Sequence, residues 1–332
     1  MLWTCLLLAL TPSAQAAMQS LRFSCSSLVT ERVDPIVAPG KPQSAHLHHI
    51  TGANGFNASM DFAEDPALRA TCSSCTFTED KSNYWTPTMF FRARNGTFKR
   101  VPVKTNGFKG ANGGMTVYYQ NRFDGTRVDT TAFQKGFRMT AGNPLSKSAT
   151  DIKPNRGQLS FTCIDASGTR SAQTMDFPKT ACANGIMVNV NFPSCWDGKN
   201  LDSPDHRSHV SYSAIKASPC PATHPVKIPR ILLETIWDTS AFNNKADWPA
   251  DGSQPFVWSF GDKLGYGNHG DYVFGWEGDS LQRAMDADCT NMNCPTLKSQ
   301  AITAANACVL QQKVPEEIDG WLKQLPGSNP VV

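Results

Sequence analysis

The sequence predicts a mainly β fold, a disulfide-stapled sandwich of jelly-roll type with a few short helices near the C-terminus. Three observations predict it. The 332 residues include 24 Gly and 22 Pro, which supply turns. Short apolar runs recur between those turns, as in sandwiches and barrels. Eleven cysteines are enough to crosslink such a fold.

Eight apolar runs are predicted to be strands. Residues 186–192 end in alternating apolar and polar residues, the pattern of a half-buried strand. The other runs are residues 88–92, 115–120, 158–163, 210–214, 230–237, 256–260 and 271–276. Helical spacing is clear only at Ile318, Trp321, Leu322 and Leu325, which predicts a C-terminal helix. Residues 280–288 and 298–309 are predicted to form weaker helices.

The first residues predict where the protein acts. Residues 1–16 carry no charge, include an apolar run and end in Ala14-Gln15-Ala16, which is typical of a signal peptide. The run is about half of the roughly 20 apolar residues that a membrane span needs. We therefore expect a secreted, extracellular protein.

The cysteines agree with secretion. Removal of Cys5 with the signal peptide leaves ten, and an even number in an exported chain predicts five disulfides. The alternative is a zinc site on Cys72 and Cys75, whose C-x-x-C spacing suits a metal knuckle. Oxidising surroundings disfavour it. Asn57 and Asn95 begin N-glycosylation sequons, so a glycoprotein is expected.

Composition limits the organisation and the partners. We expect a signal peptide over residues 1–16, one β-rich domain over residues 17–312 and a C-terminal helix and tail over residues 313–332. The net charge of +3 predicts no strong field toward nucleic acid or an anionic membrane. A monomer that recognises a polysaccharide or a cell-wall glycan is expected, because aromatic rings in extracellular proteins commonly stack on sugars and the chain has eight Trp.

The most informative segment is residues 192–209, which we call the polar segment. Gly198 and Pro204 predict looping backbone, and loops on a scaffold commonly carry function. Its polar and aromatic members are Trp196, Asp197, Lys199, Asn200, Asp202, Asp205, His206 and His209. Such a density of titratable groups indicates a functional site. The structural alternative is a surface turn held by Cys195.

Histidines form two further groups. His46, His48 and His49 lie together near the mature N-terminus, and His269 precedes Asp271. On a strand, His46 and His48 would share one face, about 7 Å apart. They could then act as a base with an orienting partner or hold a metal. A divalent ion on His46, His48 and a carboxylate such as Asp205 is one hypothesis, although no cofactor is certain.

Two other groups fit the same site. Lys81, Asn83, Tyr84 and Trp85 place a cation, an amide, a phenol and an indole close together. Arg138 lies in apolar company, where its guanidinium could bind a carboxylate.

These motifs resemble, in order, those of the DUF1996 family of secreted fungal proteins. The segments that carry the resemblance are residues 32–37, 46–48, 72–75, 80–87, 136–139, 192–209, 220–225 and 261–271. The resemblance runs from about Ser24 to Cys294 and implies secretion, but the family name records an unknown function. Members often carry WSC carbohydrate-binding modules, which we do not find here. That association favours a polysaccharide target.

Residue chemistry leaves three functions open. The slightly favoured one is β-elimination of a uronate-containing polysaccharide, which needs a cation for the carboxylate, a base and an acid. We assign the base to His48 or His206, the acid to Tyr84 or Tyr266, and the clamp to Arg138 or Lys199. Asp205 is a further catalytic candidate. The predicted substrate contacts are His46, Lys81, Asn83, Trp85, Arg138, Trp196, Asp197, Lys199, Asn200, Asp202, His209, His269 and Asp271.

The alternatives are a glycoside hydrolase and a glycan-binding protein without activity. A hydrolase would use two carboxylates about 5 to 10 Å apart. Its candidates are Asp197, Asp202, Asp205, Asp238, Asp262 and Asp271. A binding protein seldom needs so many titratable groups.

Overall fold

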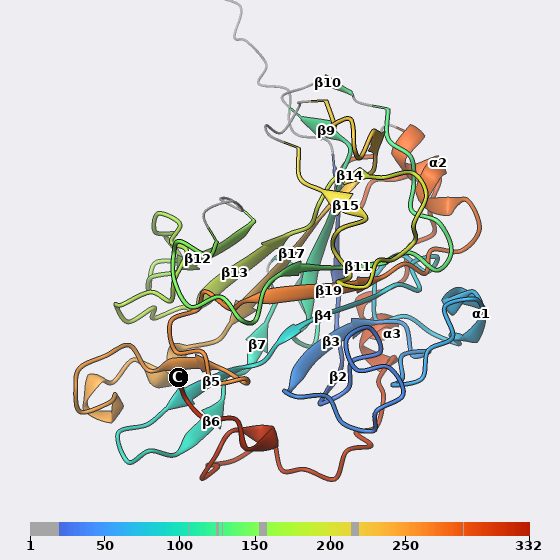
Figure 1. Ribbon diagram of the computed structural model, residues 1–332. Coiled ribbons are helices and arrows are strands. Elements are labelled where there is room, and N and C mark those ends of the chain that lie inside the picture. The colour runs from blue at the N-terminus through green and yellow to red at the C-terminus, as the bar shows by residue number, and fades with distance from the viewer. Residues whose placement is uncertain are drawn as a thin grey trace, which may run out of the picture.

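The computed structural model describes residues 20–105, 107–123, 126–127, 129–152, 158–213, 219–287 and 289–332. The predicted signal peptide, residue 214 and residue 288 lie outside this part of the chain. Within it, eleven of the nineteen strands form two sheets that pack on each other (Figure 1). The mainly β prediction is confirmed.

The first sheet has the order β1-β8-β17-β13-β12, and β7 pairs with the end of β17. All its pairs are antiparallel. The strands are β1 (Ser20–Cys25), β7 (Val103–Lys104), β8 (Met115–Gln120), β12 (Leu159–Cys163), β13 (Ile186–Asn191) and β17 (Arg230–Trp237). Apolar side chains alternate along β8 and β17, which explains why the predicted bounds of these two strands are correct to the residue.

The second sheet has the order β11-β19-β4-β3-β2, also antiparallel. Its strands are β2 (Ser27–Glu31), β3 (His48–Gly52), β4 (Asn83–Pro87), β11 (Arg138–Gly142) and β19 (His269–Val273). In Figure 1 the blue β2 and β3 lie beside β4 and the orange β19, so this sheet joins distant parts of the chain.

The two sheets share one core. Phe23, Val117 and Leu233 of the first sheet belong to the same buried cluster as Tyr84 and Tyr272 of the second. The sheets approach closely at Gly270, where an added Cβ would lie 3.1 Å from a methyl group of Val190. The inner face of the second sheet is therefore core, and its outer face is available for other segments.

Smaller elements surround the two sheets. The short strands are β5 (Met89–Arg92), β6 (Phe98–Arg100), β9 (Arg122–Phe123), β10 (Thr126–Arg127), β14 (Cys195–Trp196), β15 (Val210–Ser211), β16 (Val226–Lys227) and β18 (Phe256–Trp258). The α-helices are α1 (Pro66–Arg69), α2 (Ser280–Asp286) and α3 (Ile302–Ala307). The 3₁₀ turns are η2 (Ser240–Phe242), η3 (Lys245–Asp247) and η4 (Pro326–Ser328). None of the helices in the described residues has the length and apolarity to cross a bilayer.

The helices α2 and α3 confirm two of the predicted helices in shortened form, but the predicted helix around residues 318–325 is wrong. Leu322 instead makes two β-type backbone hydrogen bonds with Phe98. Ile318 and Leu322 pack against Phe90 and Phe98, whereas Trp321 points outward and is 54% exposed. The apolar spacing is thus satisfied by an extended segment that lies along β6.

Five disulfides form, as predicted. They join Cys25 to Cys75, Cys72 to Cys308, Cys163 to Cys182, Cys195 to Cys220 and Cys289 to Cys294. The zinc alternative at Cys72 and Cys75 is excluded because both sulfurs are oxidised. Disulfides of this number are typical of oxidising compartments. The division into one domain over residues 17–312 stays a prediction.

Candidate functional site

Three histidines meet on the outer face of the second sheet, and we call them the histidine cluster. His48 on β3 pairs with Pro87 of β4, and His269 begins β19 on the other side of β4. His46 lies in the bend that precedes β3, and its ring contacts those of His48 and His269. His48 and His269 are buried, while His46 is partly exposed. His46 and His48 lie together as expected, but through the bend before β3 and not through strand alternation.

The rings of the cluster are in contact. The ring centroid of His46 lies 4.3 Å from that of His48 and 5.0 Å from that of His269. The ring of Phe260 packs against His46 at 5.1 Å and against His269 at 5.4 Å. The Nε2 atoms of His46 and His269 are 3.1 Å apart. Burial lowers the pKa of His48 and of His269 to about 4, and it lowers the pKa of His46 well below its usual value. These imidazoles are therefore neutral at pH 7.

The position of His269 depends on a glycine. Gly142 of β11 lies opposite His269 with φ of 84°, and an added Cβ would be 2.3 Å from the carbonyl oxygen of Asn268. A side chain there would push the strand that carries His269 away from β11.

Two buried carboxylates lie beside the cluster. Asp271 follows His269 on the same face of β19, and among the described residues its Oδ2 has no hydrogen-bond partner. Burial, and next the charge of Asp34, raise the pKa of Asp271 well above its usual value. Asp34 accepts hydrogen bonds from the amides of Ile36 and Val37, but burial outweighs them and raises its pKa.

A fourth histidine borders the same region. Nδ1 of His206 donates to Oδ1 of Asp202 at 2.8 Å, and the other oxygen of Asp202 accepts from Arg138 at 2.8 Å. We call His206 and Asp202 the dyad. The backbone amide of Thr140 donates to the carbonyl of His206, so the dyad is fixed to the free edge of β11. Asp34 lies close enough to interact electrostatically with both His206 and His269, which links the dyad to the cluster.

Arg207 places a positive charge beside the histidine cluster. Its Nε donates to Thr140 Oγ1 at 2.9 Å. Its charge acts on His269 and on Asp271. Within the described residues its two terminal nitrogens make no hydrogen bond or ion pair. This guanidinium can therefore bind an anion beside the histidines.

Other members of the polar segment have structural roles. Asp197 accepts from the amides of Lys199 and Asn200, and the indole of the buried Trp196 donates to the carbonyl of Asn200. This closed turn leaves Trp196 no face for a sugar, and Lys199 is exposed on it. Trp196, Asp197 and Asn200 were predicted to contact the substrate, but their polar groups form this turn instead.

Asp205 and His209 also hold the loop together. Hydrogen bonds from Ser203, Arg207 and Ser208 converge on Asp205 and lower its pKa, although its partial burial acts in the opposite direction. Both ring nitrogens of the buried His209 are occupied, by Ser203 Oγ and by the carbonyl of Arg138. Asp205 therefore does not join His46 and His48 as the hypothesis proposed. His269 takes that place.

The predicted group at residues 81–85 lies elsewhere. Asn83 is at the opposite end of β4 from Pro87, and its amide donates to the carbonyls of Thr51 and Ala53. Lys81 lies 3.8 Å from Glu277. The indole of Trp85 is fully buried against Phe56. None of these side chains is available to a substrate at the histidines.

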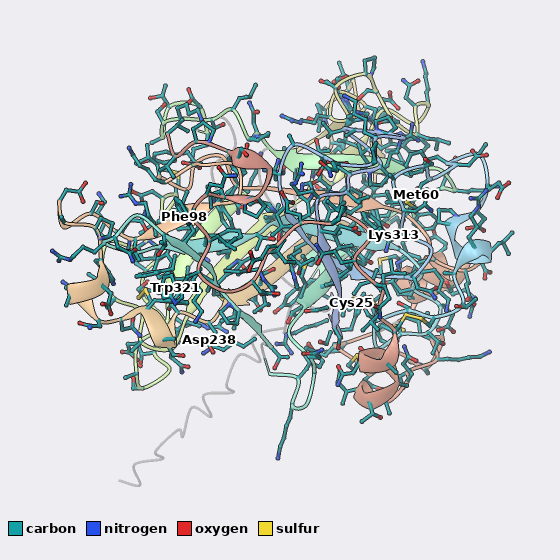
Figure 2. The ribbon with its side chains drawn as sticks, turned by 90° about the horizontal axis from the view of Figure 1, so that it is seen from below. Cys25, Met60, Phe98, Asp238, Lys313 and Trp321 are labelled. Atoms are coloured by element: carbon teal, nitrogen blue, oxygen red, sulfur yellow. A yellow bond between two sulfur atoms is a disulfide. The ribbon has the colours of Figure 1, made fainter. Side chains whose placement is uncertain are left out.

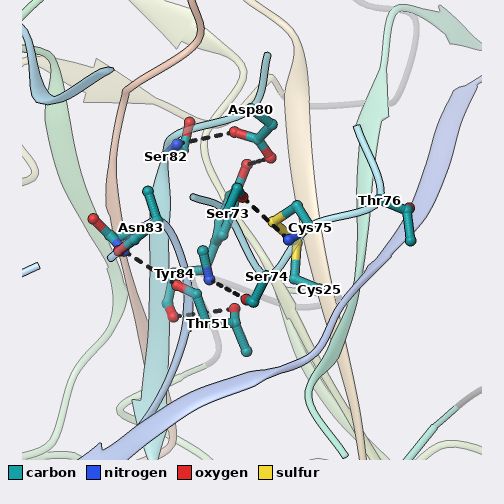
Figure 3. Close-up of a disulfide and its surroundings, with 12 residues drawn as sticks. Cys25, Thr51, Ser73, Ser74, Cys75, Thr76, Asp80, Ser82, Asn83 and Tyr84 are labelled. Atoms are coloured by element: carbon teal, nitrogen blue, oxygen red, sulfur yellow. Dashed lines mark hydrogen bonds between the residues drawn. A yellow bond between two sulfur atoms is a disulfide. The ribbon is translucent and has the colours of Figure 1, made fainter. Parts of the chain in front are cut away.

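Tyr84 belongs to the core, so its assignment as a catalytic acid is wrong. Its hydroxyl donates to Asp80 at 2.8 Å, and Asp80 also accepts from the amide of Ser82, as Figure 3 shows. Tyr119 lies 2.7 Å from the same hydroxyl. Burial, followed by the charge of Asp80, raises the pKa of Tyr84 well above its usual value. No proton can pass from this group to a bound substrate.

Tyr266 stays accessible. It is partly exposed on the loop that leads into β19, three residues before His269. Burial, and next the charges of Asp176 and Asp262, raise its pKa. The phenol therefore stays protonated at neutral pH, as a proton donor must.

Asp34 and Arg207 are the site residues that sequence reasoning missed. Both lie in motifs that were singled out, residues 32–37 and 192–209, but neither residue received a role. Their closeness to His269 depends on the pairing of β11, β19 and β4, which no local pattern specifies.

A separate hollow of about 700 Å³ lies on the side where Figure 2 labels Phe98 and Trp321. Trp321 lines it with Phe91, Phe242 and Lys99, and the Lys99 amine lies 5.3 Å over the indole ring. Of the tryptophans that the structure describes, Trp321 alone is exposed. Asn95, the second sequon, also lines this hollow.

One comparison with known proteins found a match. A family model described as a domain of unknown function (DUF1996) matches residues 34–276. That range contains all members of the histidine cluster, the dyad, Arg207 and Asp271. No curated protein and no solved structure matches the chain.

Proposed function

The chain belongs to the DUF1996 family, whose description states no function, and we therefore propose an activity from the site itself. We propose that the protein is a secreted, monomeric enzyme that cleaves a uronate-containing polysaccharide by β-elimination. The single observation that carries the proposal is the dyad. Asp202 binds Nδ1 of His206, and the His206 side chain is 23% exposed.

A carboxylate that holds one imidazole nitrogen leaves the other to act as a base. In the described part of the chain, Nε2 of His206 has no hydrogen-bond partner. In the proposed step this nitrogen removes the C5 proton of the uronate. The C5–H electrons form the C4=C5 double bond, the C4–O bond breaks, and the leaving oxygen takes a proton.

The acidity of the C5 proton depends on neutralising the uronate carboxylate. Arg207 follows His206 in the chain and has its terminal nitrogens open beside the histidines, so it replaces Arg138 and Lys199 as the proposed clamp. Arg138 is already paired with Asp202 and lies 4.1 Å over the ring of Phe62. Tyr266 stays the proposed donor to the leaving oxygen.

Hydrolysis fits the arrangement less well. Of the predicted acids, Asp202 has both oxygens bound, and Asp197, Asp205 and Asp262 each accept amide hydrogen bonds in turns. The carboxylates near the cluster are Asp34 and Asp271, and both are buried. The open groups at the site are an imidazole and a guanidinium, which suit proton abstraction beside a carboxylate.

Glycan binding without activity is the second candidate, and Trp321 is the observation that favours it. An exposed indole beside a hollow can stack on a sugar ring, and Lys99 can contact an acidic substituent. This surface is separate from the dyad, so binding there and elimination at His206 can be tested independently.

The test is incubation of the deglycosylated protein with a panel of polyuronates and neutral polysaccharides. The ultraviolet absorbance of unsaturated uronides and the number of new reducing ends are followed together. The proposal predicts that both signals rise on a polyuronate. Reducing ends without absorbance would indicate hydrolysis, and retained binding without either signal would make this a recognition protein.

A further inference from the structure

The histidine cluster has more nitrogen lone pairs than protons to satisfy them. Nδ1 of His48 lies 3.1 Å from the carbonyl oxygen of Val33, and Nδ1 of His269 lies 2.9 Å from that of Gly267. A carbonyl only accepts, so each Nδ1 carries the proton. The Nε2 atoms of His48 and His269 are therefore bare lone pairs.

His46 can satisfy one of these two atoms. Its Nε2 lies 3.1 Å from Nε2 of His269. Nε2 of His48 is then left buried with no hydrogen-bond partner in the described chain. A buried acceptor without a partner destabilises the folded state. Three such nitrogens facing one another are instead what a cation requires.

We propose that His46, His48 and His269 bind one divalent first-row transition metal, of the class of Zn²⁺ or Cu²⁺. One ligand atom from each residue lies within 4.8 Å of the others. A tetrahedral ion with bonds of about 2.0 to 2.1 Å needs ligand atoms roughly 3.3 Å apart. The 3.1 Å separation of His46 and His269 is close to that value. The ligand atom of His48 lies within 4.8 Å of the other two and would have to move at most about 1.5 Å closer.

The surroundings match those of metal-binding histidines. Such residues nearly always donate the other ring N–H to a carbonyl or carboxylate, which fixes the ring. Val33 and Gly267 do this for His48 and His269. Imidazole nitrogen favours zinc, copper, iron and nickel over calcium and magnesium, which prefer oxygen.

Nearby charges determine how well the ion is tolerated. Three neutral ligands leave two positive charges in a buried region, and Asp34 and Asp271 are the carboxylates next to it. Arg207 is a cation on the same side and opposes binding. When both carboxylates are ionised, their two negative charges outweigh the single positive charge of Arg207. The inference is independent of the proposed elimination, because it depends only on the ligand set.

The experiment measures metal binding without any assay of activity. The full chain is treated with a chelator, dialysed and titrated with Co²⁺, whose visible absorption reports nitrogen coordination, and with Zn²⁺ by calorimetry. We expect one equivalent to bind. Absence of binding by the wild type at micromolar concentrations would overturn the proposal.

Matched variants locate the ion. His46→Gln changes the partly exposed ligand and is the variant least able to disturb folding, and His48→Gln changes the buried one. His49→Gln is the control, because His49 is equally buried but packs against Trp237 on the other face of β3. We expect affinity to fall at least 100-fold in the first two and to stay unchanged in the control.

Unchanged affinity in His46→Gln would overturn the site. Equal loss in His49→Gln would also overturn it, because the effect would then reflect folding of β3. Near-ultraviolet circular dichroism identifies any variant that fails to fold. If His48→Gln fails to fold, the affinity of His46→Gln alone tests the site.

Discussion

His206 adopts a backbone conformation that few residues other than glycine adopt, with φ of 58°. Such a conformation costs about 1 to 2 kcal/mol, so the surrounding contacts must hold it. The amide of His206 donates to the carbonyl of Ser203, and the carbonyl of His206 accepts from Thr140. The result is a ring that reaches Asp202 while the loop stays pinned to β11.

Asp202 is a positioning residue, and Asp202→Asn tests that role. The amide keeps the size of the side chain but loses the charge that orients His206 and pairs with Arg138. We expect kcat on a cleaved polyuronate to fall on the order of 100-fold, with KM changed only a few-fold.

Asp205→Asn is the control within the same loop. Asn forms the same kind of turn as Asp, so kcat should stay within a few-fold of the wild type. Equal losses of kcat in both variants would mean that the loop as a whole, and not the dyad, determines the rate.

Asp80 gives a stability prediction with a definite sign. Burial raises its pKa to about 6, above the ordinary value near 4. Between about pH 4 and pH 6 the folded state binds this proton and the unfolded state does not, so the free energy of unfolding falls as the pH rises. Asp80→Asn removes this contribution, of the order of 3 kcal/mol.

Urea unfolding at several pH values between 4 and 7 measures the effect. We expect Asp80→Asn to gain stability relative to the wild type as the pH rises through this range. Asp61→Asn, at an exposed position, should run parallel to the wild type. Parallel curves for Asp80→Asn as well would mean that the buried carboxylate does not titrate there.

Individual site residues could be predicted where titratable side chains cluster in the sequence. Which of them lie together in the fold could not be predicted. His46, His48, His269 and Asp271 come together because β19 and β3 flank β4, a pairing between residues over 180 positions apart in the chain. Asp197, Asp205 and His209 belong to the same dense segment but bind its own backbone. Composition cannot separate a side chain that builds a loop from one that the loop presents.

Among the elements, the C-terminal segment shows how one apolar spacing fits two structures. Ile318, Leu322 and Leu325 pack in one cluster with Phe90, but the chain between them is not helical. Gly320 has φ of 79°, which interrupts a right-handed helix. The backbone bonds between Leu322 and Phe98 replace the helical ones.

Two adjacent substitutions distinguish these structures. Leu322 is 7% exposed, so Leu322→Ala should lower the free energy of unfolding by about 2 to 5 kcal/mol. Trp321 is exposed, so Trp321→Ala should cost far less and should weaken glycan binding at the hollow. Urea unfolding measures both. A large cost for Trp321→Ala would support a helix that buries its ring.

Four of the six strands of the first sheet, β8, β12, β13 and β17, were predicted, whereas in the second sheet only β19 was. Every second residue of β8 and β17 enters the main buried cluster, which gives the period of two; these residues are Met115, Val117 and Tyr119 of β8 and Ile231 and Leu233 of β17. β3 and β4 are buried at all positions, on both faces, and include buried His, Thr and Asn. Their sequences therefore show no alternation. β19 was predicted two residues too late for the same reason.

For the whole molecule, the disulfide between Cys72 and Cys308 joins parts of the chain 236 residues apart. Loop-closure entropy predicts that its removal costs about 5 kcal/mol. Removal of the Cys289–Cys294 disulfide, which spans 5 residues, should cost about 2 kcal/mol. Paired serine substitutions and urea unfolding compare the two. An equal or reversed order would show that the long crosslink does not constrain the unfolded chain.

The central claim is that His206, oriented by Asp202, removes a proton from a uronate substrate at the outer face of the second sheet. The most direct measurement is the rate at which His206→Gln forms unsaturated uronides from a polysaccharide that the wild type cleaves. We predict a loss of at least about 100-fold, with unchanged thermal stability and unchanged binding of the polysaccharide. A variant that keeps the wild-type rate would contradict the account.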